Sequence, residues 1–149
     1  MEPRGKEFNM RSRYLILILL AILVALPSTV LAESSSDSPR FITTYFLTNL
    51  RCPSCLTIER LTAETIQAEF AEELSAGLLE WRTINIDGEG NFHYVKDYSL
   101  YTKSVIISEY VNGKEIRWKN LPKVWELLGN EDKFSKYLKD EMTAFMAGP

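Results

Sequence analysis

Apolar and polar positions alternate along the chain in a way that predicts strands and helices in turn. Residues 41–48, FITTYFLT, are β-branched and aromatic, which is the composition of a strand. After two cysteines, apolar residues recur every three to five positions with mostly acidic residues between them, which predicts an amphipathic helix that ends at Gly77. Residues 78–87 predict a second strand, and residues 91–100 predict a short helix after the turn-forming GEGN.

The C-terminal third of the chain predicts a hairpin and a final helix. Residues 104–118 contain two strand-like runs around Asn112-Gly113, the strongest local signal for a two-residue hairpin turn. From Glu131 onward apolar residues return at helical spacing, and residues 121–128 offer one or two further turns. The predicted order is β-α-β-α-β-β-α, and its strand-helix-strand unit implies parallel strands with a right-handed crossover.

The first 32 residues predict an export signal. Basic residues precede an apolar run at residues 15–26, and TVLA then places small residues before a cleavage point after Ala32. An apolar run of about 12 residues is shorter than the roughly 20 that span a bilayer, which favours a cleaved signal over an uncleaved N-terminal anchor. Residues 33–39, ESSSDSP, predict a polar linker, and residues 40–149 form the predicted domain. We therefore expect an exported protein, periplasmic or otherwise extracytoplasmic, whose only membrane contact would be an uncleaved N-terminal segment.

The charge balance argues against a nucleic-acid partner. The full chain has 17 basic and 20 acidic residues, and removing four basic and two acidic residues with the signal leaves 13 and 18, a net charge of −5. Nucleic-acid binding needs a basic field. The carboxylates from Glu59 to Glu73 are interpreted as a solvated helix face.

Cys52 and Cys55 are the only cysteines, so the only intramolecular disulfide possible joins them. A lone C-x-x-C is compatible with three interpretations. The favoured one is thiol–disulfide exchange with a protein or a low-molecular-weight thiol. The second is a static disulfide, and the third is binding of Cu(I) or trivalent arsenic by Cys52, Cys55 and His93.

The C-x-x-C at the first strand-to-helix junction, in this order of elements, resembles the thioredoxin fold over residues 41–146. More narrowly, RCPSC followed by IE, then YSLYTKSVIISEYVNGKE, RWKNL and VWELL, resembles the small thioredoxin-like ArsF-type family of nitrophenyl compound nitroreductase subunits. The resemblance implies an α/β protein with a central mixed four-stranded sheet flanked by helices. Nitro reduction needs an electron carrier such as flavin, for which the chain has no motif. No cofactor is therefore expected beyond a redox-active disulfide.

The chain departs from the W-C-G-P-C pattern of thioredoxins at several positions. Arg51 replaces the tryptophan, and Pro53 and Ser54 form the middle pair. Phe46 stands where thioredoxins place a buried acid, six residues before the first cysteine. Ser104 aligns with the cis-proline, and because a cis peptide before serine costs about 2.5 to 4 kcal/mol, a trans peptide is expected there.

Cys52 is the expected attacking thiolate, because a helix N-terminus stabilises an anion and Arg51 adds a neighbouring cation. Cys55 would resolve the mixed disulfide. Without a carboxylate on the preceding strand, no strand side chain is predicted to take the proton from Cys55. If the protein is an enzyme, its class is thiol–disulfide oxidoreductase. The alternative is a non-catalytic thioredoxin-fold accessory subunit or a soft-metal binding module.

Overall fold

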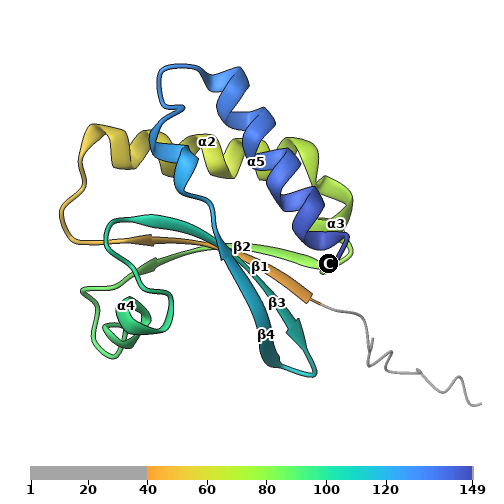
Figure 1. The fold of residues 1–149 in the computed structure, drawn as a ribbon, viewed down its shortest axis with the longest axis horizontal. Helices are drawn as coiled ribbons and strands as arrows, with labels where there is room; N and C mark the ends of the chain where they lie inside the picture. The colour runs from red at the N-terminus through yellow and green to blue at the C-terminus, as the bar shows by residue number, and fades with distance from the viewer. Residues whose placement is uncertain (1–39, 149) are drawn as a thin grey trace, which may run out of the picture. The chain divides into compact units, whose positions relative to one another are not determined.

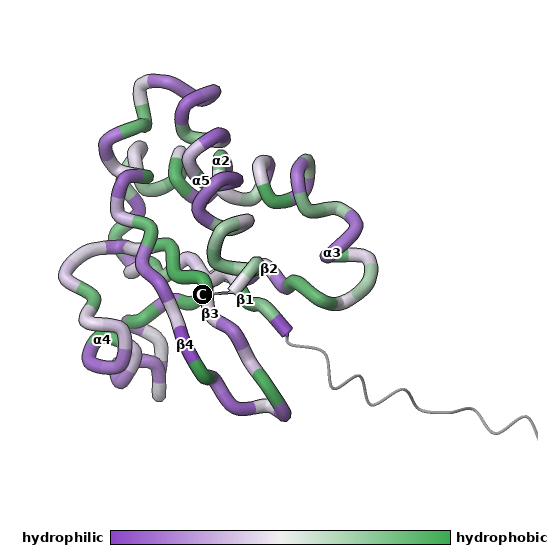
Figure 2. Tube along the Cα trace, turned by 45° about the vertical axis from the view of Figure 1, so that its right-hand side comes forward, coloured by the Kyte–Doolittle hydropathy of each residue, from purple (hydrophilic) through white to green (hydrophobic). Residues whose placement is uncertain are grey.

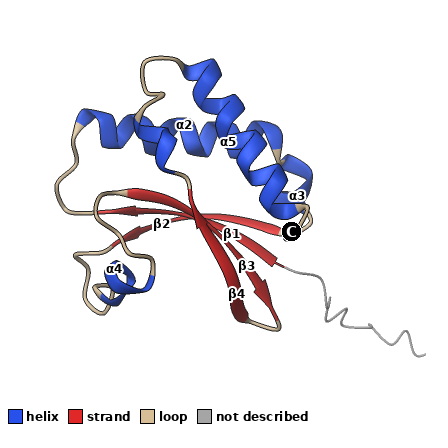
Figure 3. Cartoon of the chain, in the orientation of Figure 1, coloured by secondary structure: helices blue, strands red, loops and turns tan. Residues whose placement is uncertain are grey.

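The computed structural model describes residues 40–148, so the predicted export signal at 1–32 and the linker at 33–39 lie outside the described residues. Within residues 40–148, no helix is long and apolar enough to cross a membrane. Figure 3 shows the elements, which are β1 (Arg40–Leu47), α2 (Pro53–Glu69), α3 (Ala71–Ser75), β2 (Leu79–Asn85), α4 (His93–Asp97), β3 (Ser104–Val111), β4 (Lys114–Asn120), a 3₁₀ turn η1 (Pro122–Trp125) and α5 (Glu131–Met146).

The four strands form one mixed sheet in the order β2-β1-β3-β4. β1 pairs in parallel with β2 and antiparallel with β3, and β3 pairs antiparallel with β4. Helices α2 and α5 cover one face of the sheet, whereas the short α4 lies on the other face (Figure 1). This topology confirms the predicted thioredoxin-like fold.

The alternation of side chains along β1 divides the core between the two faces of the sheet. Phe41, Tyr45 and Leu47 belong to the large cluster that packs against α2 and α5. Phe46 belongs to a smaller cluster with Tyr98 and residues of the α4 side. Because successive side chains of a strand point to opposite faces, neighbouring residues of β1 serve different cores. Figure 2 shows that β4, which is an edge strand of the sheet, is largely hydrophilic.

The hairpin between β3 and β4 forms as predicted. Asn112 and Gly113 both have positive φ, at 51° and 74°. Positive φ at both central residues is the requirement of a type I′ turn, which Asn-Gly meets at low cost. The local sequence alone therefore predicts this connection.

The prediction of a single helix that ends at Gly77 is wrong in one respect, because the helix is interrupted at Phe70 and forms two helices, α2 and α3. Phe70 has φ −129° and ψ 31°, outside helical geometry, although its N–H still donates to the carbonyl oxygen of Ile66 at 3.0 Å. The apolar spacing of four continues through Phe70 to Leu74, and neither Gly nor Pro marks the break. Periodicity therefore cannot reveal it.

Candidate functional site

Cys52 and Cys55 form a disulfide at the N-terminus of α2, with their Cα atoms 5.0 Å apart. Cys52 is the N-cap residue in an extended conformation, and its Sγ accepts a hydrogen bond from the Cys55 N–H at 3.2 Å. Pro53 occupies the first helical turn, where its missing N–H leaves no carbonyl without a donor. The C-x-x-C sequence therefore both caps the helix and forms a disulfide.

The short loop from β1 to Cys52 is tied to the neighbouring loop after β2. The Asn49 N–H donates to Asp87 Oδ2 at 2.8 Å, and Asn85 Nδ2 donates to Asn49 Oδ1 at 2.8 Å. Both contacts join segments more than 35 residues apart. They hold the approach to α2 at the end of the sheet where β1 and β2 finish.

The two sulfurs differ in their access to solvent. Cys52 is partly exposed, whereas Cys55 has no exposed surface. The exposed residues Arg51, Pro53 and Ser54 surround Cys52 in the sequence. Because thiol–disulfide exchange requires an attacking group to reach one particular sulfur, only Cys52 is presented to a partner.

Tyr45, rather than Phe46, is the β1 residue that meets the dithiol. Tyr45 is fully buried, and its hydroxyl donates to the carbonyl oxygen of Cys55 at 3.1 Å. Phe46 lies on the opposite face, with its ring centroid 5.1 Å from those of Tyr94 and Tyr98. Counting six residues back from Cys52 therefore selects a side chain on the wrong face. The alternation of side chains along a strand places Tyr45 and Phe46 on opposite faces of the sheet, but it does not say which face α2 covers.

The phenol of Tyr45 titrates far above its ordinary range. The pKa of Tyr45 is raised to about 12, chiefly by burial and then by the negative charge of Glu59, while the positive charge of Arg51 opposes the rise. Tyr45 therefore remains a neutral hydrogen-bond donor across the physiological range. Its hydroxyl fixes the first turn of α2 against the sheet.

The sequence suggests that Arg51 is a free cation beside Cys52, but in the structure its charge is paired. Its guanidinium forms an ion pair with the carboxylate of Glu59, two turns into α2. Glu59 is correspondingly not a fully solvated residue of the acidic face, because 29% of its side chain is exposed. A cation whose charge is matched by a carboxylate stabilises a nearby thiolate less than an unmatched one. Sequence reasoning missed Tyr45 and the pairing of Glu59.

Ser104 is the first residue of β3 and is buried, with 4% of its surface exposed. Its Oγ donates to the carbonyl oxygen of Thr102 at 2.9 Å, and Trp125 Nε1 donates to the carbonyl oxygen of Lys103 at 2.9 Å. All peptide bonds within the described residues are trans, which confirms the expected geometry between Lys103 and Ser104. The segment that leads into β3 is thereby held by η1.

The side chain of His93 contacts a residue of its own helix and neither cysteine. Its Nδ1 is 2.7 Å from Asp97 Oδ2, one turn along the exposed α4. In the part of the chain that the structure describes, no three His, Cys, Asp or Glu side chains are grouped to hold a metal ion. The predicted three-ligand group of Cys52, Cys55 and His93 is therefore not assembled.

A hollow of about 320 Å³ lies at the end of the sheet where β1 finishes and β3 begins. Its walls mix apolar and polar side chains from three loops and from α4, namely Thr48, Ile86, Val95, Leu100, Tyr101, Thr102 and Lys103. The side chain of Tyr101 is almost fully exposed. Thr48 belongs to the loop between β1 and Cys52, but neither Cys52 nor Cys55 lines the hollow.

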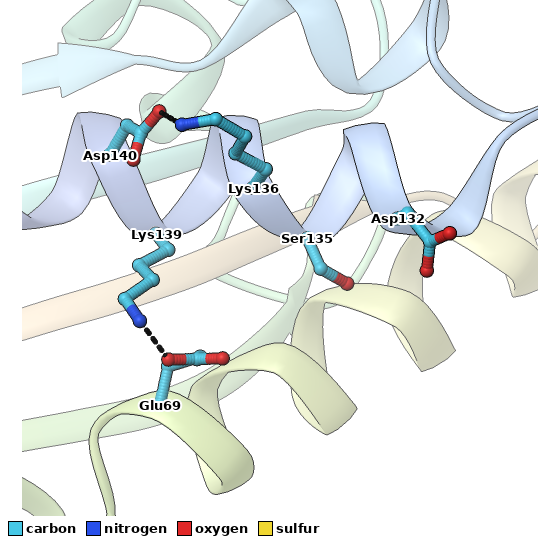
Figure 4. A pocket seen from close by; sticks show the side chains of 6 residues that line it. All are labelled: Glu69, Asp132, Ser135, Lys136, Lys139 and Asp140. Atoms are coloured by element: carbon cyan, nitrogen blue, oxygen red, sulfur yellow. Dashed lines mark hydrogen bonds and ion pairs between the residues drawn. The ribbon is translucent and has the colours of Figure 1, made fainter.

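A second hollow, of about 380 Å³, lies between the last turn of α2 and α5. Figure 4 shows that α5 contributes five of its six residues and α2 contributes Glu69, which pairs with Lys139. Lys136 pairs with Asp140 at 2.6 Å along α5. At a rise of about 1.5 Å per residue, the length of α2 puts Glu69 roughly 25 Å from Cys52. This charged groove belongs to the helix surface and not to the dithiol site.

Comparisons with known proteins give structural likenesses only. No family model and no curated protein matches the chain. Among solved structures, Trxlp from Edwardsiella tarda EIB202 is 20% identical, with a TM-score of 0.41, covering 70% of this chain and 85% of its own. Thioredoxin from Trypanosoma brucei brucei is also 20% identical, with a TM-score of 0.41 and coverage of 72% and 79%. Thioredoxin from Fasciola hepatica is 19% identical, with a TM-score of 0.37 and coverage of 72% and 86%. The thioredoxin-like fold assigned here follows from the order, direction and pairing of its own four strands.

Proposed function

We propose that this protein exchanges thiols and disulfides with a partner through Cys52 and Cys55. The main support for this proposal is the difference in exposure between the two cysteines. Cys52 is partly exposed at the N-cap of α2, whereas Cys55, one turn later, is fully buried. Unpaired N–H groups and the helix dipole favour a negative charge at this end of a helix. A thiolate on Cys52 is therefore favoured near neutral pH.

The proposed exchange proceeds through one mixed disulfide. In the reducing direction, the Cys52 thiolate attacks a partner disulfide, forms a Cys52–partner bond and releases one partner sulfur as a thiolate that takes a proton from water. The Cys55 thiol then loses its proton to solvent and attacks Cys52 Sγ, which forms the Cys52–Cys55 disulfide and releases the second partner thiolate. The partner gains two electrons and this protein loses two. Every step reverses in the oxidising direction, and the compartment's potential decides between them.

Tyr45 supports this role by holding the backbone of Cys55, the residue that must move a sulfur toward Cys52. Ser104 stands at the start of β3, in place of the proline that related folds use to receive an extended substrate. The hollow beyond the end of β1, with its mixed apolar and polar lining, would suit a side chain of a protein partner. Arg51, Pro53 and Ser54 would contact that partner first because all three are exposed.

The proposal places the exchange outside the cytoplasm, because the order of basic, apolar and small residues in the first 32 positions favours export. It does not extend to reduction of nitro compounds. The narrower resemblance to a nitroreductase subunit family would need an electron carrier on another chain, with this protein as its accessory subunit. That arrangement is the alternative function, together with soft-metal binding by the two reduced thiols.

A trapping experiment tests the proposal. Full-length Cys55→Ser protein should accumulate a mixed disulfide on Cys52 with its natural partner, because the second thiol that would release the partner is missing. Cys52→Ser is the matched control and should trap nothing, while dithiothreitol should dissolve every trapped complex. An empty trap, together with a Cys52 pKa near 8.5 and no exchange with glutathione, would leave a static disulfide as the correct interpretation.

A further inference from the structure

Helix α2 carries two arginine–carboxylate clusters with different surroundings. Arg51, the residue before the N-cap Cys52, pairs with Glu59 of α2. Arg60, the next residue after Glu59, instead pairs with Glu64 and with Glu131 of α5, each at 2.7 Å. Each cluster pairs an arginine with a carboxylate of α2, so one serves as an internal control for the other.

The position of Tyr45 ties the Arg51–Glu59 pair to the dithiol. The Tyr45 hydroxyl is hydrogen-bonded to the carbonyl of Cys55, and both Arg51 and Glu59 act electrostatically on that hydroxyl. The charges of Arg60, Glu64 and Glu131 do not contribute to the raised pKa of Tyr45. Glu59 is also one turn after Cys55, a spacing that brings Cβ atoms to about 5 to 6 Å on a helix surface. A charge on either partner of the Arg51–Glu59 pair is therefore close to the first turn of α2.

The N-terminal end of the α2 dipole and the Arg51 guanidinium both favour a negative charge at Cys52. Only the charge of Arg51 is paired with a carboxylate. The N-terminus of α2 provides a positive dipole end, and Arg51 is the adjacent residue in the chain. If the Arg51 charge were unmatched, both would stabilise the Cys52 thiolate and make the disulfide easier to reduce. Glu59 supplies the negative charge that offsets Arg51.

We propose that the Arg51–Glu59 ion pair is a positioning element that sets the reduction potential of the Cys52–Cys55 disulfide, with Glu59 limiting the stabilisation that Arg51 gives to the Cys52 thiolate. The inference rests on the proposed thiol–disulfide function and deepens it. Two partner thiols, which become a disulfide, supply the two electrons that break the S–S bond; Cys55 takes up a proton, and Cys52 remains a thiolate to the extent that its surroundings favour the charge. The ion pair acts only on that last quantity, so it changes the equilibrium and not the stoichiometry.

The proposal predicts opposite effects for the two partners. In full-length Glu59→Gln protein the unmatched Arg51 charge should lower the Cys52 pKa and shift the equilibrium with glutathione about three- to tenfold toward the dithiol, where tenfold corresponds to about 30 mV. Arg51→Gln should leave Glu59 unmatched, raise the Cys52 pKa and shift the equilibrium toward the disulfide. The double variant should return close to the wild-type equilibrium. Quantitative alkylation after equilibration in glutathione buffers measures all three.

Matched variants separate this effect from a structural one. Glu64→Gln removes a carboxylate from the other cluster on α2 and should leave the potential unchanged. Glu59→Asp keeps the charge and should restore most of the wild-type potential. Circular dichroism and thermal melting verify that each variant is folded, and the titration of Cys52 thiolate absorbance gives an independent readout.

Equal potentials for wild-type protein and Glu59→Gln, or equal shifts for Glu59→Gln and Glu64→Gln, would overturn the inference. Shifts of the same sign for Arg51→Gln and Glu59→Gln would overturn it as well. The proposed function fails separately, because an empty Cys55→Ser trap concerns partners, whereas the glutathione equilibrium of the isolated disulfide can still respond to Glu59.

Discussion

At its N-terminal end, α2 carries the disulfide and is tied to the sheet by the hydroxyl of Tyr45, whereas near its C-terminal end it packs Ile66 and Phe70 into the large core. Each end also has an ion pair, Arg51 with Glu59 and Lys139 with Glu69. Lys139 and Glu69 meet in an open charged groove between two helices. The charges of Arg51 and Glu59 instead influence the pKa of Tyr45, whose buried hydroxyl is hydrogen-bonded to the Cys55 carbonyl oxygen.

The comparison predicts that the surroundings of an ion pair determine what its removal changes. An exposed pair is screened by water and contributes little to stability. Charged groups beside a titratable sulfur change the free energy of one protonation state relative to the other. We therefore expect substitutions near the C-terminal end of α2 to change stability alone, and those near its N-terminal end to change the dithiol as well.

The largest stability change is expected from Ile66→Ala. Ile66 is fully buried in the large core, and truncating a buried isoleucine costs about 2 to 5 kcal/mol through lost contacts and a residual cavity. Urea denaturation of the oxidised protein measures the loss. The equilibrium of the folded variant with glutathione should match that of wild type. A shifted equilibrium would mean that the two ends of α2 are coupled through the core.

The second-largest effect is expected at alkaline pH, which should weaken the hydrogen bond from the Tyr45 hydroxyl to the first turn of α2. The pKa of Tyr45 is about 12 in the folded protein and lies near 10 when the chain is unfolded. A raised folded-state pKa means that the contribution is complete below pH 10 and is lost as pH rises through 12. The free energy of unfolding should therefore fall over this window, and Tyr45→Phe should remove that part of the fall. A fall of the same size in Tyr45→Phe would assign the effect to other groups, such as Tyr98, whose pKa is also raised by burial.

A smaller effect at neutral pH is expected from Tyr45→Phe. The change keeps the buried ring and deletes the hydroxyl that donates to the Cys55 carbonyl, so the loss should be about 0.5 to 1.5 kcal/mol, the net contribution of one hydrogen bond. Chemical denaturation gives this value. Phe46→Leu, on the opposite face of the same strand, is the control for dithiol effects. If the phenol positions Cys55, only Tyr45→Phe should change the rate of exchange with glutathione.

The smallest effect is expected from Glu69→Gln. Its pair with Lys139 is solvent-exposed, and such pairs contribute about 0 to 1 kcal/mol. Raising the salt concentration should reduce even that difference. Neither the Cys52 pKa nor the potential should move. A measurable shift of either would show that charges at the far end of α2 reach the dithiol.

Features set by neighbouring residues were predictable. The Asn112-Gly113 turn follows from the positive φ that these two residues tolerate, and Cys52 at the start of a helix follows from Pro53 and the apolar spacing after it. The break at Phe70 was not predictable, because the apolar spacing runs through it and no helix-breaking residue stands there. The predicted parallel pair and antiparallel hairpin were correct, because a crossover helix implies parallel strands and a two-residue turn implies antiparallel ones.

The sequence by itself determined a helix-capping cysteine followed by a second one a turn later, because both properties depend on residues within one turn of each other. Tertiary structure decided that Tyr45 and not Phe46 meets Cys55, since a period of two separates the faces of a strand without saying which one a distant helix covers. It also decided that Arg51 pairs with Glu59. The charge felt by a thiol depends on distances in space, and the conformation of the loop before α2 sets those distances.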